Sequence, residues 1–159
     1  MKKEFLNIVL YNPQIPPNTG NILRLCSNTR SKLHLIRPLG FNIDDKSLKR
    51  ARLDYKVSYE IYNEFNDYIK LHDNTKKKYF ITKYGDKNYS EQEFAEGDSL
   101  IFGSEINGLP QSLLSKNKYA KLFIPMAKQS RSLNLSNAVA ICLYEALRQN
   151  NFFNLKRFV

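Results

Sequence analysis

The chain has 159 residues, which suits a single domain that buries about two-thirds of its unfolded surface in one core. Its 42% hydrophobic and 13% aromatic residues supply that core and exclude a disordered chain. With 25 Lys and Arg against 15 Asp and Glu, the net charge is +10. A domain this basic favours a polyanionic partner, and nucleic acid is the first candidate; solubility alone is the other explanation.

Membranes, disulfides and metals are all disfavoured by the sequence. No apolar segment reaches the roughly 18 residues of a membrane span, and the first residues lack a signal-peptide core, so we expect a cytoplasmic protein. Cys26 and Cys142 lie far apart in apolar helical patterns and are predicted to be reduced core thiols. His34 and His72 have no ligand-type neighbours in the sequence, so no metal is expected.

Strands and helices alternate through the first half of the chain. The apolar run 5–10 predicts a strand, and residues 11–17, with three prolines, predict a stiff connection. The spacing of Ile22, Leu25 and Cys26 predicts a helix over about 22–29, capped by Asn18 or Thr19. The next predicted elements are a strand at 33–36, helices at 44–52 and 64–71, and a strand at 79–82.

The second half contains the densest group of polar and glycine residues. Residues 86–97 read as a loop or weak helix, and the apolar run 100–102 predicts a buried strand followed by a bend at Gly103 and Gly108. Residues 122–126 predict another strand, which Pro125 must end because proline has no N–H for a ladder. A polar turn then leads into a buried helix that begins near residue 135. The alternation predicts an α/β fold with a mainly parallel sheet flanked by helices.

Polar residues at strand ends are the usual ligand site in such sheets. No G-x-G-x-x-G turn follows the first strand, which disfavours a dinucleotide fold or an ordinary Rossmann methyltransferase, and there is no Gly-Lys-Ser/Thr phosphate loop. Taken singly, the Gly, Asn and Ser residues are typical of turns and caps, and Arg24 is typical of a solvated helix face. Alternatively, a helix start with Arg24 beside it suits a phosphate or a developing oxyanion.

Three segments, in order, resemble the motifs of the SPOUT methyltransferases. They are Asn-x-Gly-Asn-Ile-x-Arg at 18–24, Gly-Ser-Glu followed by Gly-Leu-Pro within 103–110, and Ile-Pro-Met with Ser-Leu-Asn-Leu-Ser-Asn-Ala-Val within 124–139. With the preceding segment 10–17, the pattern is similar to the tRNA (cytidine/uridine-34-2'-O)-methyltransferase family in particular. The resemblance covers nearly the whole chain.

The resemblance implies a single domain over residues 1–159 with a C-terminal deep trefoil knot, an exception to the rule that chains avoid threading. It also implies 2'-O-methylation of the tRNA wobble nucleotide, with S-adenosylmethionine as cofactor, the anticodon stem-loop as partner and a homodimer with composite sites. At Gly103 we expect that a side chain would obstruct the approach of the cofactor. The residues that the resemblance assigns to cofactor binding are Ile81, Gly103, Ile124, Met126, Ser132 and Leu133.

The polar residues of the family map onto Asn18, Arg24, Glu105, Ser132 and Asn134. A ribose hydroxyl has a high pKa, so its proton must be drawn off or its developing charge stabilised. We expect Arg24 to do this, aided by an RNA phosphate and acting on the cofactor of the other subunit. Ser132 and Asn134 would position Arg24 and the substrate. Glu105 would hold the knot loops, and for Glu105 and Asn18 a structural role is at least as strongly expected as a catalytic one.

The chain departs from the family pattern at Ile106 and Asn107, where many relatives carry a basic residue expected to contact RNA. The alternatives are therefore a 2'-O-methyltransferase for another tRNA or rRNA site, or a knotted RNA-binding protein without activity. The joint presence of Arg24, Ser132 and Asn134 argues against the second alternative. Base methylation is disfavoured, because a carboxylate near the target base would be expected.

A dimer interface is the least specific prediction from the sequence. The chain after residue 150 is polar, then aromatic and basic, which suits packing on a partner subunit, although aromatic residues on a helix more often belong to the core. The residues that could supply an apolar interface are Tyr144, Phe152, Phe153 and Phe158.

Overall fold

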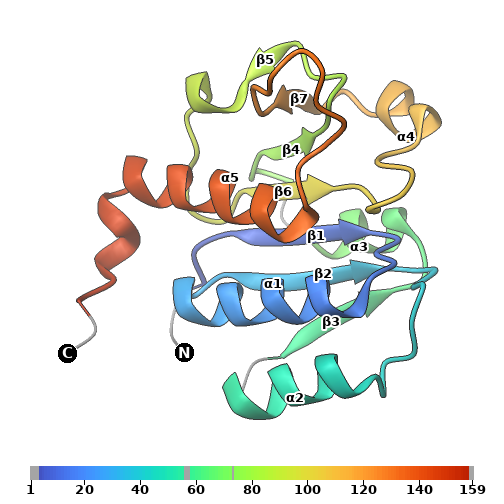
Figure 1. The fold of residues 1–159 in the computed structure, drawn as a ribbon. Helices are drawn as coiled ribbons and strands as arrows, with labels where there is room; N and C mark the ends of the chain where they lie inside the picture. The colour runs from blue at the N-terminus through green and yellow to red at the C-terminus, as the bar shows by residue number, and fades with distance from the viewer. Residues whose placement is uncertain (1–3, 56–57, 73, 158–159) are drawn as a thin grey trace.

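The computed structural model describes residues 4–55, 58–72 and 74–157, which contain a seven-stranded sheet with helices on both faces (Figure 1). All described strand pairs are parallel, and the strand order is β3-β2-β1-β6-β4-β7-β5. The predicted α/β class with a mainly parallel sheet is confirmed. The strands are β1 Asn7–Tyr11, β2 Lys32–Ile36, β3 Tyr59–Tyr62, β4 Lys78–Ile81, β5 Lys87–Asn88, β6 Ser99–Phe102 and β7 Ala120–Phe123.

Alternate strand residues supply two hydrophobic cores, one on each face of the sheet. Ile8 and Leu10 of β1 belong to the core beneath α1, α2 and α5, whereas Val9 belongs to the core beneath α3 and α4. The central strands β1 and β6 therefore read as largely apolar runs, because both of their faces are covered. The helices are α1 Pro16–Thr29, α2 Lys46–Tyr55, α3 Phe65–Leu71, α4 Gln111–Lys116 and α5 Leu135–Gln149, with 3-10 turns η1 Tyr89–Glu91 and η2 Asn151–Asn154.

The start of α1 corrects the sequence prediction by two turns. The helix begins at Pro16, not near residue 22, and Ile15 rather than Asn18 or Thr19 is the residue before its first turn. Pro16 and Pro17 favour this start, because a proline at the first helical positions has the required φ and lacks only an N–H that would have no helical partner. Asn18 is buried inside the first turn, which leaves its side chain available to other segments.

Two strands and one short helix are missing from the sequence prediction. Strand β3 lies between the predicted helices at 44–52 and 64–71, strand β5 lies within the segment read as a loop, and α4 lies between the glycine bend and β7. Helix α4 is only six residues long, and Pro110 before it offers no side-chain cap, so its start has no sequence signal. Its one fully buried residue, Leu114, anchors it to the second core.

The cysteine prediction is confirmed, since both thiols are free and buried. Burial raises the pKa of Cys142 to about 12 and that of Cys26 further, so neither is poised as a nucleophile. The histidine prediction is wrong in its premise. The fold brings His34 and His72 together with Glu60, because β2, β3 and the end of α3 are neighbours in space although distant in sequence.

The aromatic residues proposed for a dimer interface divide into two groups. Tyr144 and Phe152 are about half exposed, at 47% and 46%. Phe153 instead packs on Phe5 of the same chain, with ring centroids 4.9 Å apart, and Phe158 lies outside the described residues. The described helices include none that is long and apolar enough to span a membrane.

Candidate active site

Three adjacent parallel strands end at the edge of the sheet where the cofactor site is predicted. Ile81, the last residue of β4, is paired with Phe102 of β6 on one side and Leu122 of β7 on the other. Gly103 and Ile124 follow those two strands closely, so both lie at the same carboxyl edge as Ile81. The structure therefore brings Ile81, Gly103 and Ile124 together, which the sequence analysis assigned to the ends of separate strands.

Glu105 lies in the bend after β6 and binds the start of α1. Its Oε2 accepts a hydrogen bond from the backbone N–H of Gln14 at 2.8 Å, and its Oε1 accepts one from Ile15 N–H at 3.0 Å. Ile15 has no polar side chain with which to cap the helix, so a carboxylate from a segment 90 residues away satisfies N–H groups at its start. The negative charge also complements the positive end of the α1 dipole.

Asn18 links this carboxylate to the third motif. Its Nδ2 donates to Glu105 Oε1 at 3.2 Å, and its Oδ1 accepts from Asn134 Nδ2 at 3.0 Å. Asn134 in turn caps α5, because its Oδ1 accepts from the N–H groups of Ser136 and Asn137. We call Glu105, Asn18 and Asn134 the edge network; it connects the bend after β6 to the starts of α1 and α5.

The other two predicted catalytic residues lie outside the described hydrogen bonds of the edge network. Arg24 is on the exposed side of α1, six residues beyond Asn18 and hence about 9 Å further along the helix axis. Ser132 is exposed in the segment before Asn134. Within one chain, hydrogen bonds therefore join Asn18, Glu105 and Asn134, whereas Arg24 lies further along α1.

The structure gives a reason for glycine at 103 that does not involve the cofactor. A Cβ at this position would lie 2.1 Å from the carbonyl carbon of Gly108 and 2.3 Å from the nitrogen of Leu109. The bend folds back on itself here, as the bridge between Ser104 and Gly108 also shows. Glycine at 103 is thus required by the bend's own backbone, before any ligand is considered.

The segment 124–134 carries exposed apolar side chains beside the edge network. Met126 is 40% exposed and Leu133 is 37% exposed, and Ile15 and Ile106, next to the contact between Glu105 and the α1 start, are 43% and 73% exposed. Large exposed apolar side chains in segments that carry a polar cluster suit a ligand or a partner surface.

A surface hollow lies elsewhere on the same edge. It has a volume of about 650 Å³ and lies where β1 to β3 end, between α3 and α4. None of the predicted cofactor-binding residues lines it. Its polar lining includes Arg37, Asn63, Glu64, Ser112, Lys116 and Asn117.

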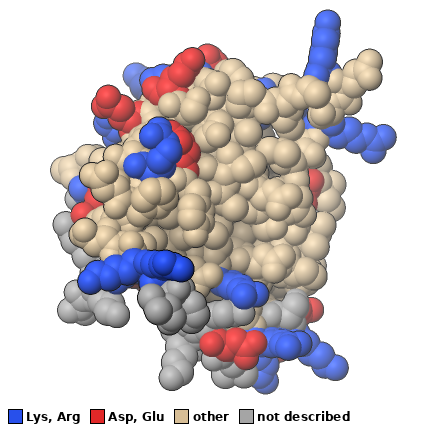
Figure 2. Space-filling view, turned by 60° about the vertical axis from the view of Figure 1, so that its left-hand side comes forward, with Lys and Arg blue, Asp and Glu red and all other residues tan. Residues whose placement is uncertain are grey.

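Basic side chains occur in several loops at the carboxyl edge. Arg37 follows β2, Lys83 follows β4, and Lys128 and Arg131 follow β7, and all four residues are exposed. These separate positions suit contact with an extended polyanion more than a single compact anion site. Figure 2 brings forward the left-hand side of Figure 1, away from this edge, and there Lys and Arg side chains lie mainly around the margins of a broad surface of other residues.

Comparison with known proteins decides the family. Residues 5–144 match the SpoU rRNA methylase family. The chain belongs to that family. It is 47% identical over 153 residues to the tRNA (cytidine(34)-2'-O)-methyltransferase of Escherichia coli strain K12, covering 91% of this chain and 93% of the relative.

Solved structures agree with this membership. A structure concerned with the 2-OH methylation of C/U34 on tRNA has a TM-score of 0.87 and 39% identity, covering 93% of this SpoU-family chain and 97% of the other. The SpoU methyltransferase AviRb from Streptomyces viridochromogenes, solved with AdoMet, has a TM-score of 0.82 at 23% identity, over 95% of this chain and 60% of its own. The latter shares the fold; threading of the knot in this chain stays a prediction.

The sequence prediction did not name the backbone donors that hold Glu105. The N–H groups of Gln14 and Ile15 hold Glu105, but main-chain donors have no side-chain signature. It also missed Ser104, a buried hydroxyl whose oxygen accepts the N–H of Asn107 and so shapes the bend. The resemblance of segment 10–17 to the family was the available signal for the first pair.

Proposed function

We propose that this SpoU-family chain is a tRNA methyltransferase that methylates the 2'-hydroxyl of the wobble nucleotide, a cytidine or modified uridine at position 34. The observation that carries the proposal is the edge network. It binds together one polar residue from each of the three motif segments, Asn18, Glu105 and Asn134. Relatives near half identity carry the same named activity over more than nine-tenths of the chain.

S-adenosylmethionine is the proposed cofactor and, when bound, supplies the electrophilic methyl group. The residues fit it: Ile81, Gly103 and Ile124 present backbone groups at one edge, and Met126 and Leu133 offer exposed apolar side chains for an adenine ring. Ser132 adds a hydroxyl for polar groups of the cofactor. The edge network keeps the flanking segments in place by fixing the starts of α1 and α5.

Arg24 has the proposed catalytic role. The ribose oxygen attacks the methyl carbon, the carbon–sulfur bond breaks, and the hydroxyl proton passes to an RNA phosphate or to solvent. A guanidinium beside that oxygen stabilises its developing negative charge and orients the phosphate that takes the proton. Asn134 and Ser132 position the substrate, and Glu105 serves through its hydrogen bonds to the α1 start.

We place Arg24 in a composite site of a homodimer, as the resemblance to the family implies. In a symmetric dimer, Arg24 of one subunit would complete the site that the other subunit forms around its cofactor. Tyr144 on α5 and the exposed Ile15 supply apolar surface for such a contact. The tRNA anticodon stem-loop would then lie across basic loops of the carboxyl edge, in the cytoplasm.

Mixing two inactive variants tests the composite site. Arg24→Ala and a cofactor-site variant, Leu133→Asp, are unfolded together and refolded at equal amounts. If Arg24 acts across the dimer, half of the dimers are mixed and each has one intact site, so about a quarter of the wild-type activity returns. If Arg24 acts on the cofactor of its own chain, no activity returns, and the composite-site proposal fails.

The function is tested by methyl transfer from radiolabelled S-adenosylmethionine to total tRNA of a strain that lacks its wobble methyltransferase. Nucleoside mapping should place the label on the 2'-oxygen at position 34. Label on another tRNA nucleotide or only on rRNA would identify a different target. Calorimetric binding of the cofactor without any transfer would favour a non-catalytic RNA-binding protein, and either result would overturn the proposal.

A further inference from the structure

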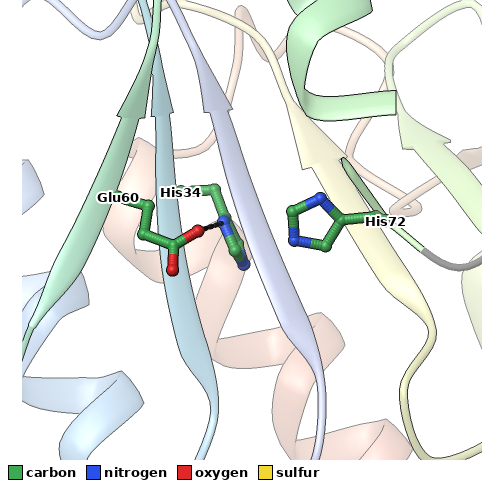
Figure 3. A group of neighbouring side chains, drawn as sticks. All are labelled: His34, Glu60 and His72. Carbon is green, nitrogen blue, oxygen red and sulfur yellow. Dashed lines mark ion pairs between the residues drawn. The ribbon is translucent and has the colours of Figure 1, made fainter. Parts of the chain in front are cut away.

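A second polar cluster lies on the side of the sheet that α3 covers (Figure 3). His34 is in the middle of β2, fully buried, and is paired in register with Glu60 of β3. His72 is the residue after α3, and its ring lies 4.7 Å from the His34 ring, measured between centroids. One nitrogen or oxygen of each residue lies within 4.8 Å of the others, and we call these three residues the histidine cluster.

Hydrogen bonds fix which nitrogen of His34 carries the proton. Asn7 uses its Nδ2 to donate to the carbonyl of Gly97, so its Oδ1 faces His34 Nε2 at 3.0 Å and must accept a proton from it. The neutral ring therefore presents a lone pair at Nδ1. That nitrogen lies 3.7 Å from Oε2 of Glu60.

His72 is oriented in the same way by the backbone. Its Nδ1 lies 2.8 Å from the carbonyl oxygen of Tyr68, which only accepts, so Nδ1 carries the proton and Nε2 has the lone pair. Tyr68 also stacks on the ring at a centroid distance of 4.0 Å. A histidine that gives one N–H to a carbonyl and presents its other nitrogen is the usual arrangement of a metal ligand.

The histidine cluster has more hydrogen-bond acceptors than protons that can be donated to them. The Tyr62 hydroxyl donates to Oε2 of Glu60 and also lies 3.1 Å from Nδ1 of His34. One hydroxyl proton cannot serve both, so either the His34 lone pair or the carboxylate lacks a donor at this contact. Because the His34 ring is fully buried, leaving its lone pair without a donor costs free energy, and a cation would remove that cost.

A protonated His34 is not expected to provide the missing positive charge. Burial, followed by the charge of His72, lowers the pKa of His34 to about 3. The Lys32 ammonium, 2.6 Å from Oε1, and then the Tyr62 hydroxyl lower the pKa of Glu60 to about 2. Near neutral pH the cluster thus contains a neutral imidazole and a carboxylate, which are the forms that bind metals. Lys32 holds Oε1, so Glu60 would bind through Oε2 alone.

We propose that His34, Glu60 and His72 form a binding site for a divalent transition metal, with Zn²⁺ as the ion that best suits two imidazoles and one carboxylate. Three ligands about 2 Å from a tetrahedral Zn²⁺ are roughly 3.3 Å apart. His34 and Glu60 are close to that separation, and His72, half-buried at the end of α3, supplies the remaining movement.

The metal would act on the fold and not on methyl transfer. Its ligands lie within β2, near the start of β3 and after α3, whereas the edge network lies at loops that follow β6 and precede α1 and α5. A bound ion would fasten the end of α3 to the two strands beneath it. This inference does not depend on the proposed function, and the two can fail separately.

Binding is measured on the full chain without a histidine tag, because the chain contains only 2 His and a tag would bind metal itself. Zn²⁺ titration by calorimetry should show one saturable site per chain, and Co²⁺ should give the visible absorption of a tetrahedral site. Both imidazole signals in NMR spectra should shift on Zn²⁺ addition. Saturating Zn²⁺, at about 100 times its Kd, should raise the Tm by roughly 5–10 °C.

His72→Gln and Glu60→Gln are the test variants, since His72 is half-buried and Glu60 is largely exposed and both replacements should fold. Each should weaken Zn²⁺ binding at least about tenfold, whereas Glu93→Gln, an exposed control, should leave it unchanged. Folding is checked by the Tm without metal. Absence of saturable binding to the wild-type chain, or equal binding by wild type and both test variants, would overturn the proposal.

Discussion

The edge network and the histidine cluster are both built from three distant segments, but only the first is complete in its hydrogen bonds. Each side-chain oxygen of Glu105, Asn18 and Asn134 accepts at least one N–H. In the histidine cluster, one hydroxyl proton of Tyr62 faces two acceptors, His34 and Glu60. The edge network is therefore fully hydrogen-bonded within the chain, whereas the histidine cluster has an acceptor that an added cation could satisfy.

The same comparison indicates where catalysis must come from. The edge network has no uncommitted acid or base, because its carboxylate already accepts backbone and amide N–H groups. A complete clamp of this kind positions loops precisely, which is what a methyl-transfer site requires. The chemical group must be added to it, and Arg24 is the residue we propose for that role.

Arg24→Ala should have the largest effect. We expect kcat to fall at least about 100-fold while S-adenosylmethionine affinity and Tm stay near the wild-type values, because the side chain is exposed. Arg50→Ala, on the exposed side of α2, is the matched control and should retain full activity. The measurement is single-turnover methyl transfer to tRNA, with calorimetry for the cofactor. Activity within about tenfold of wild type would remove Arg24 from the mechanism.

Gly103→Ala should have the largest effect on folding. The new methyl group would lie 2.1 Å from the backbone of Gly108, so the bend must open, and we expect a loss of at least about 3 kcal/mol in unfolding free energy. Gly108→Ala is the matched control: its φ is +64° and no atom lies near the added carbon, so the cost should be only about 1–2 kcal/mol. Equal costs, measured by urea unfolding, would contradict this explanation of the bend.

These two glycines show what the sequence could and could not supply. The pattern of Gly103 and Gly108 predicted a tight bend correctly, since glycine permits both close approach and positive φ. It could not say which glycine meets which atoms, because that depends on how the bend closes. The structure shows that a side chain at 103 would meet the bend's own backbone, and the predicted obstruction of the cofactor there stays a prediction.

The same limit applies to the two polar clusters. Asn18, Glu105 and Asn134 were chosen because they resemble family motifs, but their mutual hydrogen bonds span 87 and 116 residues and follow only from the topology. His34 and Glu60 meet because β2 and β3 are parallel neighbours in register. Local periodicity predicts strands well, but the choice of partner strand and register depends on packing across the whole sheet.

Glu105→Gln tests whether the clamp depends on the carboxylate. An amide has one acceptor oxygen, and its NH₂ group would face an N–H donor at Gln14 or Ile15, leaving at least one donor unpaired. We expect a loss of about 2 kcal/mol, which corresponds to roughly 4–8 °C in Tm, together with weaker cofactor binding. Glu93→Gln, at an exposed position, should leave both unchanged. An unaltered Tm for Glu105→Gln would mean that the α1 start does not depend on this carboxylate.

Substitutions of Asn134 can distinguish its role as a helix cap from its role in linking two motifs. Their effects on stability should be the smallest of those predicted. Asn134→Ala removes both the α5 cap and the donor to Asn18, so it should cost about 1–2 kcal/mol. Asn134→Asp keeps an oxygen that can accept from Ser136 N–H but loses the N–H given to Asn18 Oδ1. If the link matters for catalysis, Asn134→Asp should retain most of the stability and yet lose activity about as severely as Asn134→Ala. Full activity of Asn134→Asp, measured by methyl transfer beside its Tm, would reduce Asn134 to a helix cap and leave Glu105 and Asn18 as a clamp on α1 alone.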